Sequence, residues 1–195
     1  LLRKVIVYQY DKNGNQLQTL AEFEKPRKEG LNEVYKGMTY GDATISFENL
    51  IEKTQNTFDG FGRLVKVETI KGGARIIVEY SYNGDDLRVK KTVKRSANNY
   101  AAEESNYLYD RQHVILETDG NNSVKARYAR GINYIARIDG ANKLSYFLYN
   151  GHGDVVQVVA PTGTVENRYD YDIFGNPTLT VENYNCAIRY AGEFY

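Results

Sequence analysis

The stretch DYDIFGNP, residues 170–177, joins the end of an alternating run to a tight turn. Asp172 opens a four-residue turn and Gly175 closes it, because an Asp carboxylate can accept a backbone N–H two residues on and Gly accepts positive φ. Upstream, residues alternate with period two, as in a strand with one packed and one solvated face. We therefore predict a strand that ends at Tyr171 and a turn in which Asp172 is structural and not catalytic. The packed set is predicted to be Val165, Asn167, Tyr169 and Tyr171, and the solvated set Glu166, Arg168, Asp170 and Asp172.

The same combination recurs along the chain. An aromatic residue lies four positions before a turn residue that is usually Gly, and Asp often follows the aromatic residue, as at Asp11, Asp59, Asp110 and Asp172. The spacing is regular, and we interpret these positions as the structural turns of one repeat. The pairs are Tyr10 with Gly14, Phe58 with Gly62, Tyr80 with Gly84, Tyr109 with His113, Tyr149 with Gly153, and Tyr171 with Gly175; Gly131 joins them with Tyr128 one place closer, and Gly131, Gly153 and Gly175 follow one another at steps of 22 residues.

Each repeat carries a second turn near its middle. These turns are KGGA at 71–74, DGNN at 119–122, DGAN at 139–142 and PTGT at 161–164. Turn signals every 8–12 residues indicate one strand after another, joined by tight connections. The predicted fold is therefore all-β, with antiparallel β-hairpin repeats that form one twisted, curved sheet.

Residues 24–57 follow this rhythm least and are predicted to be irregular, with a short helix or an insertion. Ser46 can act as an N-cap, and the residues behind it lie at helical spacing: Phe47, Leu50, Ile51 and Thr54. Residues 44–47 also fit a strand, so both alternatives stay open.

Composition excludes several functional classes. The chain has 195 residues, and 25 Lys and Arg balance 25 Asp and Glu, so no basic excess indicates nucleic acid as a partner. Cys186 is the only cysteine, so neither an internal disulfide nor a cysteine metal cluster can form, and a buried or half-buried thiol is expected. No apolar run approaches the roughly 20 residues of a membrane span. The start Leu1-Leu2-Arg3-Lys4 leads us to expect a piece of a longer polypeptide.

These repeats resemble the YD (tyrosine–aspartate) repeats of the Rhs family, which also occur in bacterial toxin-complex shell proteins and in teneurins. The closing IRYAGEFY (188–195) resembles the start of the Rhs-associated core, which gives repeats over 1–187 and a truncated core segment over 188–195. Seven matches in register carry the resemblance: YQYDKNGNQL (8–17), FDGFGRLVKVE (58–68), YNGDDLRVKK (82–91), YDRQHVILETDG (109–120), RGINYIARIDG (130–140), LYNGHGDVVQV (148–158) and RYDYDIFGNP (168–177).

The resemblance implies a non-catalytic structural segment of a large bacterial protein, secreted or attached to the cell surface or wall. Such a segment builds a β-shell that encloses or presents a C-terminal toxin or effector, its implied partner. The self-cleaving aspartates of the family lie beyond this sequence, so no residue here takes their role. Several repeats depart from the pattern: Asn83 and Asn150 stand near the expected Asp, and His113 replaces Gly.

Two catalytic or metal-binding interpretations were weighed from the residues themselves. His113 and His152 are the only histidines, and a metal site would need them to converge with carboxylates such as Asp110 or Asp154; solvated turn residues are the simpler interpretation. The pairs Asp170 with Asp172 and Asp85 with Asp86 suggest a glycosidase, but such chemistry needs one carboxyl with a raised pKa in a cleft. We therefore predict no enzyme, no metal and no cofactor.

One alternative function remains, because tyrosine-rich β-surfaces can also bind carbohydrate or protein partners at a cell surface. Nucleic acid and membrane are not expected as partners. Residues 3–10, RKVIVYQY, are expected to form a terminal strand whose free edge promotes self-association.

Overall fold

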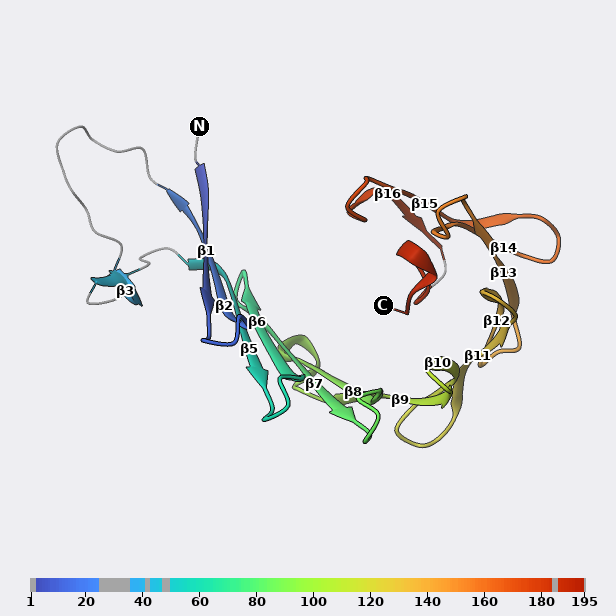
Figure 1. Cartoon of the computed structure of the whole chain (residues 1–195), viewed down its shortest axis with the longest axis horizontal. Coiled ribbons are helices and arrows are strands. Elements are labelled where there is room, and N and C mark those ends of the chain that lie inside the picture. Colours follow the sequence, from blue (N-terminus) through green and yellow to red (C-terminus); the bar gives the residue numbers. More distant parts are fainter. Residues whose placement is uncertain (1–2, 25–35, 41–42, 47–49, 184–185, 195) are drawn as a thin grey trace. The chain divides into compact units, whose positions relative to one another are not determined.

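The computed structural model describes residues 3–24, 36–40, 43–46, 50–183 and 186–194 (Figure 1). Over these residues the chain is all-β apart from two short 3₁₀ turns, so the predicted fold class is confirmed. The strands are β1 (Arg3–Tyr10), β2 (Gln16–Glu24), β3 (Lys36–Tyr40), β4 (Ala43–Ser46), β5 (Leu50–Phe58), β6 (Leu64–Lys71), β7 (Ala74–Tyr82), β8 (Arg88–Arg95), β9 (Ala102–Asp110), β10 (His113–Thr118), β11 (Val124–Arg130), β12 (Tyr134–Asp139), β13 (Leu144–Tyr149), β14 (Val155–Val159), β15 (Val165–Tyr171) and β16 (Pro177–Glu182); the 3₁₀ turns are η1 (Ser96–Asn98) and η2 (Tyr190–Gly192).

Fourteen of these strands form one open sheet in nearly sequential order. The order is β1-β2-β5-β6-β7-β8-β9-β10-β11-β12-β13-β14-β15-β16, and β3 and β4 form a separate two-stranded ladder. Sequential antiparallel order follows from the sequence, because each strand is joined to the next by a connection of a few residues outside the β2–β5 region. No helix among the described residues is long and apolar enough to cross a membrane.

Of the two alternatives for residues 46–54, the structure has strands. Residues 43–46 form β4 and residues 50–58 form β5, so Leu50 and Thr54 are extended and not helical. Phe47 lies outside the described residues. β-branched residues and pairing with β2 and β6 outweigh the helical spacing here.

The chain divides into two compact units, Leu1–Glu104 and Ser105–Tyr195. In the first unit the sheet is a single layer, and its only buried side chains among the described residues are Leu20, Ala21 and Thr92. Val67, Val78 and Val93 stand directly opposite one another across β6, β7 and β8. Charged pairs such as Lys94 with Glu79 (2.7 Å) link neighbouring strands, which stabilises a sheet whose faces are only half-buried.

The second unit contains the hydrophobic core. Strands β9 to β16 curve around the C-terminal segment, residues 186–194, which lies on their inner side (Figure 1). Inward-facing side chains of the strands meet this segment, and most of the described residues that are fully buried lie here. The core cluster consists of Val114, Ala126, Tyr128, Tyr134, Phe147, Val155, Val158, Tyr169, Cys186 and Ile188.

The predicted alternation along β15 is correct at one end and wrong at the other. Asn167 and Tyr169 are fully buried and Tyr171 is half-buried, as predicted. Val165, however, is 46% exposed, and Glu166 is buried. A register shift between Val158 and Val159 pairs Val159 with Val165, and this bulge moves Glu166 to the packed side.

Candidate functional site

Eight of the hairpin turns share one backbone geometry. In each, the first residue donates its N–H to the carbonyl of the fifth, and the fourth donates its N–H to the carbonyl of the first. The fourth residue has positive φ in every case, which places a bulge at the end of the hairpin. The turns begin at Asp11, Asp59, Asn83, Asp119, Asp139, Asn150, Ala160 and Asp172, and their fourth residues are Gly14, Gly62, Asp86, Asn122, Asn142, Gly153, Gly163 and Gly175.

A side-chain oxygen anchors all of these turns except the one at Ala160. Oδ1 of Asp172 accepts the N–H of Phe174 at 2.8 Å and of Asn176 at 2.9 Å. The other anchors accept the same two N–H groups with their Oδ1 atoms: Asp11, Asp59, Asn83, Asp119, Asp139 and Asn150. The hydrogen bonds from the Asn176 side chain and backbone lower the pKa of Asp172, which favours the ionised acceptor.

The structure corrects the predicted turn around Tyr80 and Gly84. The turn begins one residue after Tyr82, at Asn83, and its residue with positive φ is Asp86 at 61°. Gly84 is the second residue of the turn. Asn83 supplies the acceptor oxygen that Asp supplies in other turns, and Asp86 adopts the left-handed conformation that Gly adopts in most of them. The residue with positive φ therefore lies two positions after the predicted Gly84.

The prediction at Tyr109, Asp110 and His113 is also wrong in its turn type. Asp110 is the last residue of β9 and pairs directly with His113, the first residue of β10. Only two residues connect these strands, and Arg111 has a φ of 57°, as two-residue hairpins require. Tyr109 packs against the core from the strand.

The weighed carboxylate pairs do not have the environment of a catalytic acid. Asp172 is engaged in its turn and has a lowered pKa, whereas a general acid needs a raised one. Asp86 contacts Arg63 at 2.8 Å. Among the described residues, no group of three or more His, Cys, Asp or Glu is arranged to hold a metal ion.

A cluster of hydrogen bonds forms where the C-terminal segment docks at Asp154. Oδ1 of the buried Asp154 accepts the backbone N–H of Ala191 at 2.9 Å and lies 2.9 Å from Nδ1 of His152. Its Oδ2 accepts Nδ2 of Asn150 at 2.8 Å, and the next residue, Val155, donates its N–H to the Arg189 carbonyl at 3.0 Å. Burial raises the pKa of Asp154, but these hydrogen bonds offset it and hold the pKa below its usual value.

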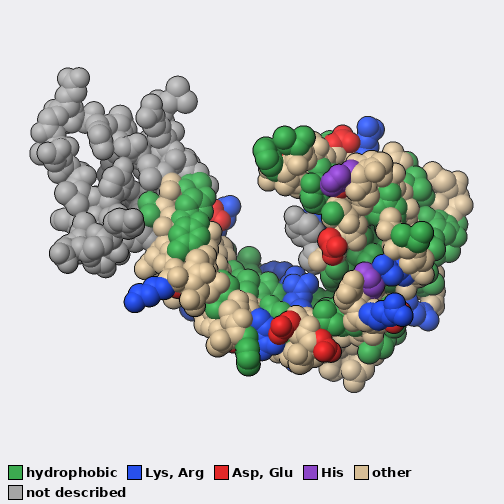
Figure 2. All heavy atoms as spheres, in the orientation of Figure 1, with side chains coloured by type: hydrophobic (Ala, Val, Ile, Leu, Met, Phe, Trp, Pro, Cys, Tyr) green, Lys and Arg blue, Asp and Glu red, His purple; other side chains and the backbone are tan. Residues whose placement is uncertain are grey.

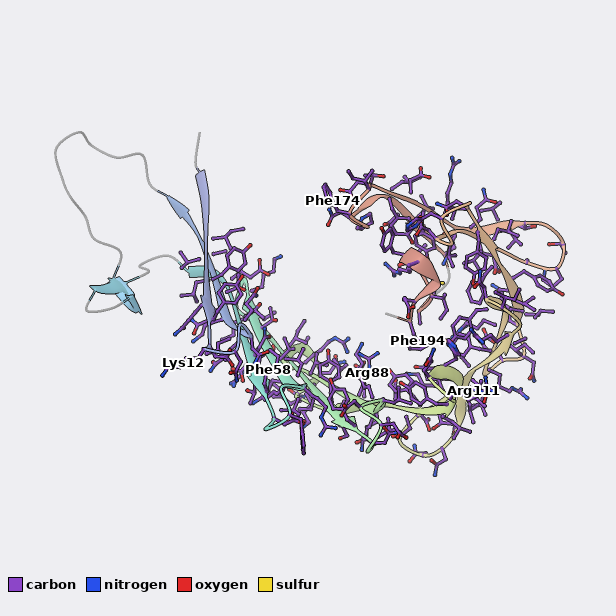
Figure 3. All side chains as sticks on the ribbon, viewed as in Figure 1. Lys12, Phe58, Arg88, Arg111, Phe174 and Phe194 are labelled. Carbon is purple, nitrogen blue, oxygen red and sulfur yellow. The ribbon has the colours of Figure 1, made fainter. Side chains whose placement is uncertain are left out.

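Aromatic rings hold the middle and the end of the docked segment. Phe194 makes edge-to-face contacts with Tyr107 and Tyr128 at centroid distances of 5.6 Å, and Figure 3 shows it on the inner side of the strands. Tyr190 contacts the rings of Tyr171 at 5.6 Å and His152 at 5.5 Å. These contacts join residues far apart in the sequence, so the turn motif gives no signal for them.

A hydrogen-bond network around Glu182 fixes the segment to β15 and β16. Glu182 accepts the Tyr169 hydroxyl at 2.6 Å and the Arg189 guanidinium at 2.7 Å. Burial and the nearby Glu182 raise the pKa of Tyr169 far above its usual value, so it is a neutral donor. The Cys186 thiol is buried, as predicted, and donates to the Ile188 carbonyl at 2.9 Å.

Comparison with known proteins relates the chain to segments of larger bacterial proteins. No family model matches it. It is 31% identical over 204 residues to the tRNA nuclease WapA of Bacillus subtilis (strain 168). This alignment covers 98% of this chain and 8% of that protein. It is 32% identical to the tRNA(Glu)-specific nuclease WapA of Bacillus subtilis subsp. natto over 79% of this chain and 7% of that protein.

The fold also matches solved toxin structures. A crystal structure of TcdB2-TccC3-Cdc42 aligns with a TM-score of 0.56 at 18% identity, over 98% of this chain and 11% of that chain. The Photorhabdus luminescens Tc holotoxin pore aligns with a TM-score of 0.56 at 16% identity over the same share of each chain. The chain thus spans about a tenth or less of the proteins it matches, and the comparisons support, at this coarse level, a relationship to β-shell segments of Rhs-type proteins.

Proposed function

We propose that this chain is a non-catalytic structural segment of a larger Rhs-type protein, secreted or on the cell surface, and builds part of a β-shell that encloses or presents a C-terminal toxin or effector. The repeated hairpins support this role, because seven of the turns are anchored by a side chain of their own first residue and each strand needs its neighbours for stability. The similarity to a small share of much longer toxin and nuclease proteins supports it further.

The position of the C-terminal segment carries the proposal. Residues 186–194 leave the sheet after β16, turn back and pack on the inner side of β9 to β16, where Ile188 is completely buried. A polypeptide that continued from Phe194 would therefore begin on the inner side of this curved sheet. That is where an enclosed effector has to start.

Catalysis, under this proposal, belongs to another part of the protein. The named tRNA nuclease activity is that of relatives of which this chain matches 8%. Of the weighed aspartates, Asp172 anchors its own turn and Asp86 forms an ion pair with Arg63. We expect the purified chain to leave total tRNA intact, as read on a denaturing gel beside an active ribonuclease. Cleavage that co-purifies with the chain and disappears after substitution of one of its carboxylates would contradict a non-catalytic role.

The enclosing role is tested in the longer polypeptide that carries this segment. Gly175→Ala places a methyl group against the ring of Tyr190, whereas Gly163→Ala meets no atom within 4 Å. If the docked segment leads an effector into the shell, limited proteolysis should cut the downstream region faster in Gly175→Ala than in Gly163→Ala. Equal cutting in both variants, at rates above the parent protein, would argue against enclosure through this contact.

Recognition of a carbohydrate or protein partner is the second candidate. Tyr8 and Tyr10 of β1 are 51% and 56% exposed, and such rings can stack on sugars. A glycan array with the purified chain tests this, and binding that Tyr8→Ala abolishes would favour it. Figure 2 shows further hydrophobic side chains on the surface, so a Leu148→Ala variant serves as a control for nonspecific adhesion.

A further inference from the structure

Ile173 and Phe174 form an apolar tip on the turn between β15 and β16. Ile173 is 86% exposed and Phe174 is 79% exposed, and Figure 3 shows Phe174 at the end of its hairpin. They are the second and third residues of the turn that begins at Asp172. We call these two residues the apolar tip.

The other seven turns of this geometry show that the backbone does not require large apolar side chains at these two positions. The third residue only has to donate its N–H to the anchoring oxygen, as every residue except Pro can do. Turn formation therefore does not explain the apolar tip. The second residues of the other turns are Lys12, Gly60, Gly84, Gly120, Gly140, Gly151 and Pro161, and the third residues are Asn13, Phe61, Asp85, Asn121, Ala141, His152 and Thr162.

Phe61 is the only other phenylalanine at a third position, and it has a partner within the chain. The guanidinium carbon of Arg63 lies 5.0 Å from the centroid of the Phe61 ring, which is a cation–π distance. The ring of Phe174 has no ring or cation contact among the described residues. Its large apolar surface therefore has no use within this chain.

Hydrogen bonds and one packing contact fix the turn that presents the tip. Asp172 Oδ1 accepts the N–H groups of Phe174 and Asn176, and the Asn176 side chain donates to Asp172 Oδ2 at 2.8 Å. Gly175 lies against the Tyr190 ring, because a Cβ added there would be 2.8 Å from it. A side chain on a preorganised turn loses little backbone entropy when it binds a partner.

The charge beside the tip is negative. Between residues 168 and 189 the sequence contains Asp170, Asp172 and Glu182 and no Lys or Arg. Glu182 is paired with Arg189 at 2.7 Å, which leaves the two aspartates beside the tip. An anionic membrane surface attracts Lys and Arg and is therefore unfavourable for this turn. A protein surface that carries Lys or Arg is complementary to it.

We infer that the apolar tip docks in an apolar pocket, bordered by Lys or Arg, in another part of the larger polypeptide proposed above. The inference rests on the proposed function in one respect, namely that this chain is a segment of a longer protein. The chain matches 8% of the WapA nuclease and 11% of a solved toxin chain, so a protein of that size has most of its surface outside this segment. Parts of one polypeptide also meet at high effective concentration.

The composition of the tip fits such a contact. Aromatic residues are enriched at the buried centre of protein contacts, and charged residues lie at the solvated rim. Phe174 would supply the centre, and Asp170 and Asp172 would supply the rim.

Photo-cross-linking in the longer polypeptide tests the inference at two matched positions. p-Benzoylphenylalanine replaces Phe174 in one variant and Ala141 in the other. Both are third residues of turns anchored by Asp, and both are exposed. The Ala141 turn follows β12 and the Phe174 turn follows β15, so the two turns lie at opposite edges of the antiparallel sheet.

At position 174 we expect cross-links within the same polypeptide, to a segment outside residues 1–195 that carries apolar residues together with Lys or Arg. The yield should be several times that at position 141. High salt should reduce the yield at position 174, because salt screens the charge pairs at the rim. A yield that salt leaves unchanged would contradict the basic border of the pocket.

Equal yields at the two positions, or cross-links from position 174 only to residues 1–195 or to separate molecules, would overturn the inference. Binding of the purified chain to vesicles of phosphatidylcholine and phosphatidylserine, abolished by Phe174→Ser, would also overturn it, because lipid would then be the partner. Phe174→Ser should leave the urea midpoint of the purified chain unchanged, since the ring is exposed, so that lost binding is separable from unfolding. Failure of the proposed function has a different readout, namely equal cutting of the downstream region in Gly175→Ala and Gly163→Ala.

Discussion

At the scale of single residues, one side-chain oxygen atom anchors seven of the eight bulged turns. In each of these turns a single Oδ1 accepts two backbone N–H groups of the same turn, as at Asp11, Asp59 and Asp172. This chemistry is local, so the sequence predicts these turns well. It fails at Gly84, because a glycine can stand at the second position of the turn while Asp86 takes the positive φ.

Gly175 has a second constraint that the sequence does not reveal. Gly175 and Gly163 have nearly equal φ values of 82° and 85°, but a Cβ on Gly175 would lie 2.8 Å from the ring of Tyr190, whereas one on Gly163 would meet nothing within 4 Å. Each Ala substitution should cost about 1–2 kcal/mol for backbone strain. Gly175→Ala should lose about 1–3 kcal/mol more through overpacking. Urea unfolding measures both, and equal losses would show that the Tyr190 contact is unimportant.

At the scale of elements, strand existence is predicted from the sequence better than strand orientation. Alternation correctly buries Asn167 and Tyr169, but it assigns the wrong faces to Val165 and Glu166, because a bulge shifts the register at Val159. The docking of residues 186–194 is also invisible in the pattern. It depends on contacts such as that of Ala191 with Asp154, which are 37 residues apart in sequence.

Asp154 should make this docked segment sensitive to acid. The pKa of Asp154 is lower in the folded chain than its usual value, so its ionised form stabilises the fold above the unfolded pKa of about 3.9. That contribution is lost as pH falls through the lower folded pKa. Asp154→Ala should cost about 2 kcal/mol at pH 7, because it leaves buried donors unpaired, and should reduce the acid dependence.

Asp170→Ala is the matched control for this change. Asp170 is an exposed carboxylate on β15, and its loss should alter the free energy of unfolding by less than about 0.5 kcal/mol. Urea unfolding of both variants at pH 7 and at pH 3 separates the two effects. If Asp154→Ala loses as much stability at pH 3 as at pH 7, the ionised carboxylate does not hold the segment.

At the scale of the whole molecule, one sheet contains two different kinds of stability. The first unit is a single layer held by cross-strand pairs, with three buried side chains among its described residues. The second unit has a hydrophobic core that its own C-terminal segment completes. Burial of apolar surface is the dominant favourable term in folding, so the two units should differ in local stability.

Hydrogen exchange on the whole chain should show this difference, since exchange rates report the free energy of local opening. Amides of β13, β14 and β15 should exchange most slowly, and those of β6, β7 and β8 faster. Phe194→Ala removes a ring that packs on Tyr107 and Tyr128, so it should speed exchange in β9 and β11 and leave β6 to β8 unchanged. Phe174→Ala is the control, because Phe174 is exposed at the tip of its turn (Figure 3). Faster exchange throughout both units in Phe194→Ala would mean that the chain opens as a single cooperative body, and the C-terminal segment would then stabilise the entire sheet.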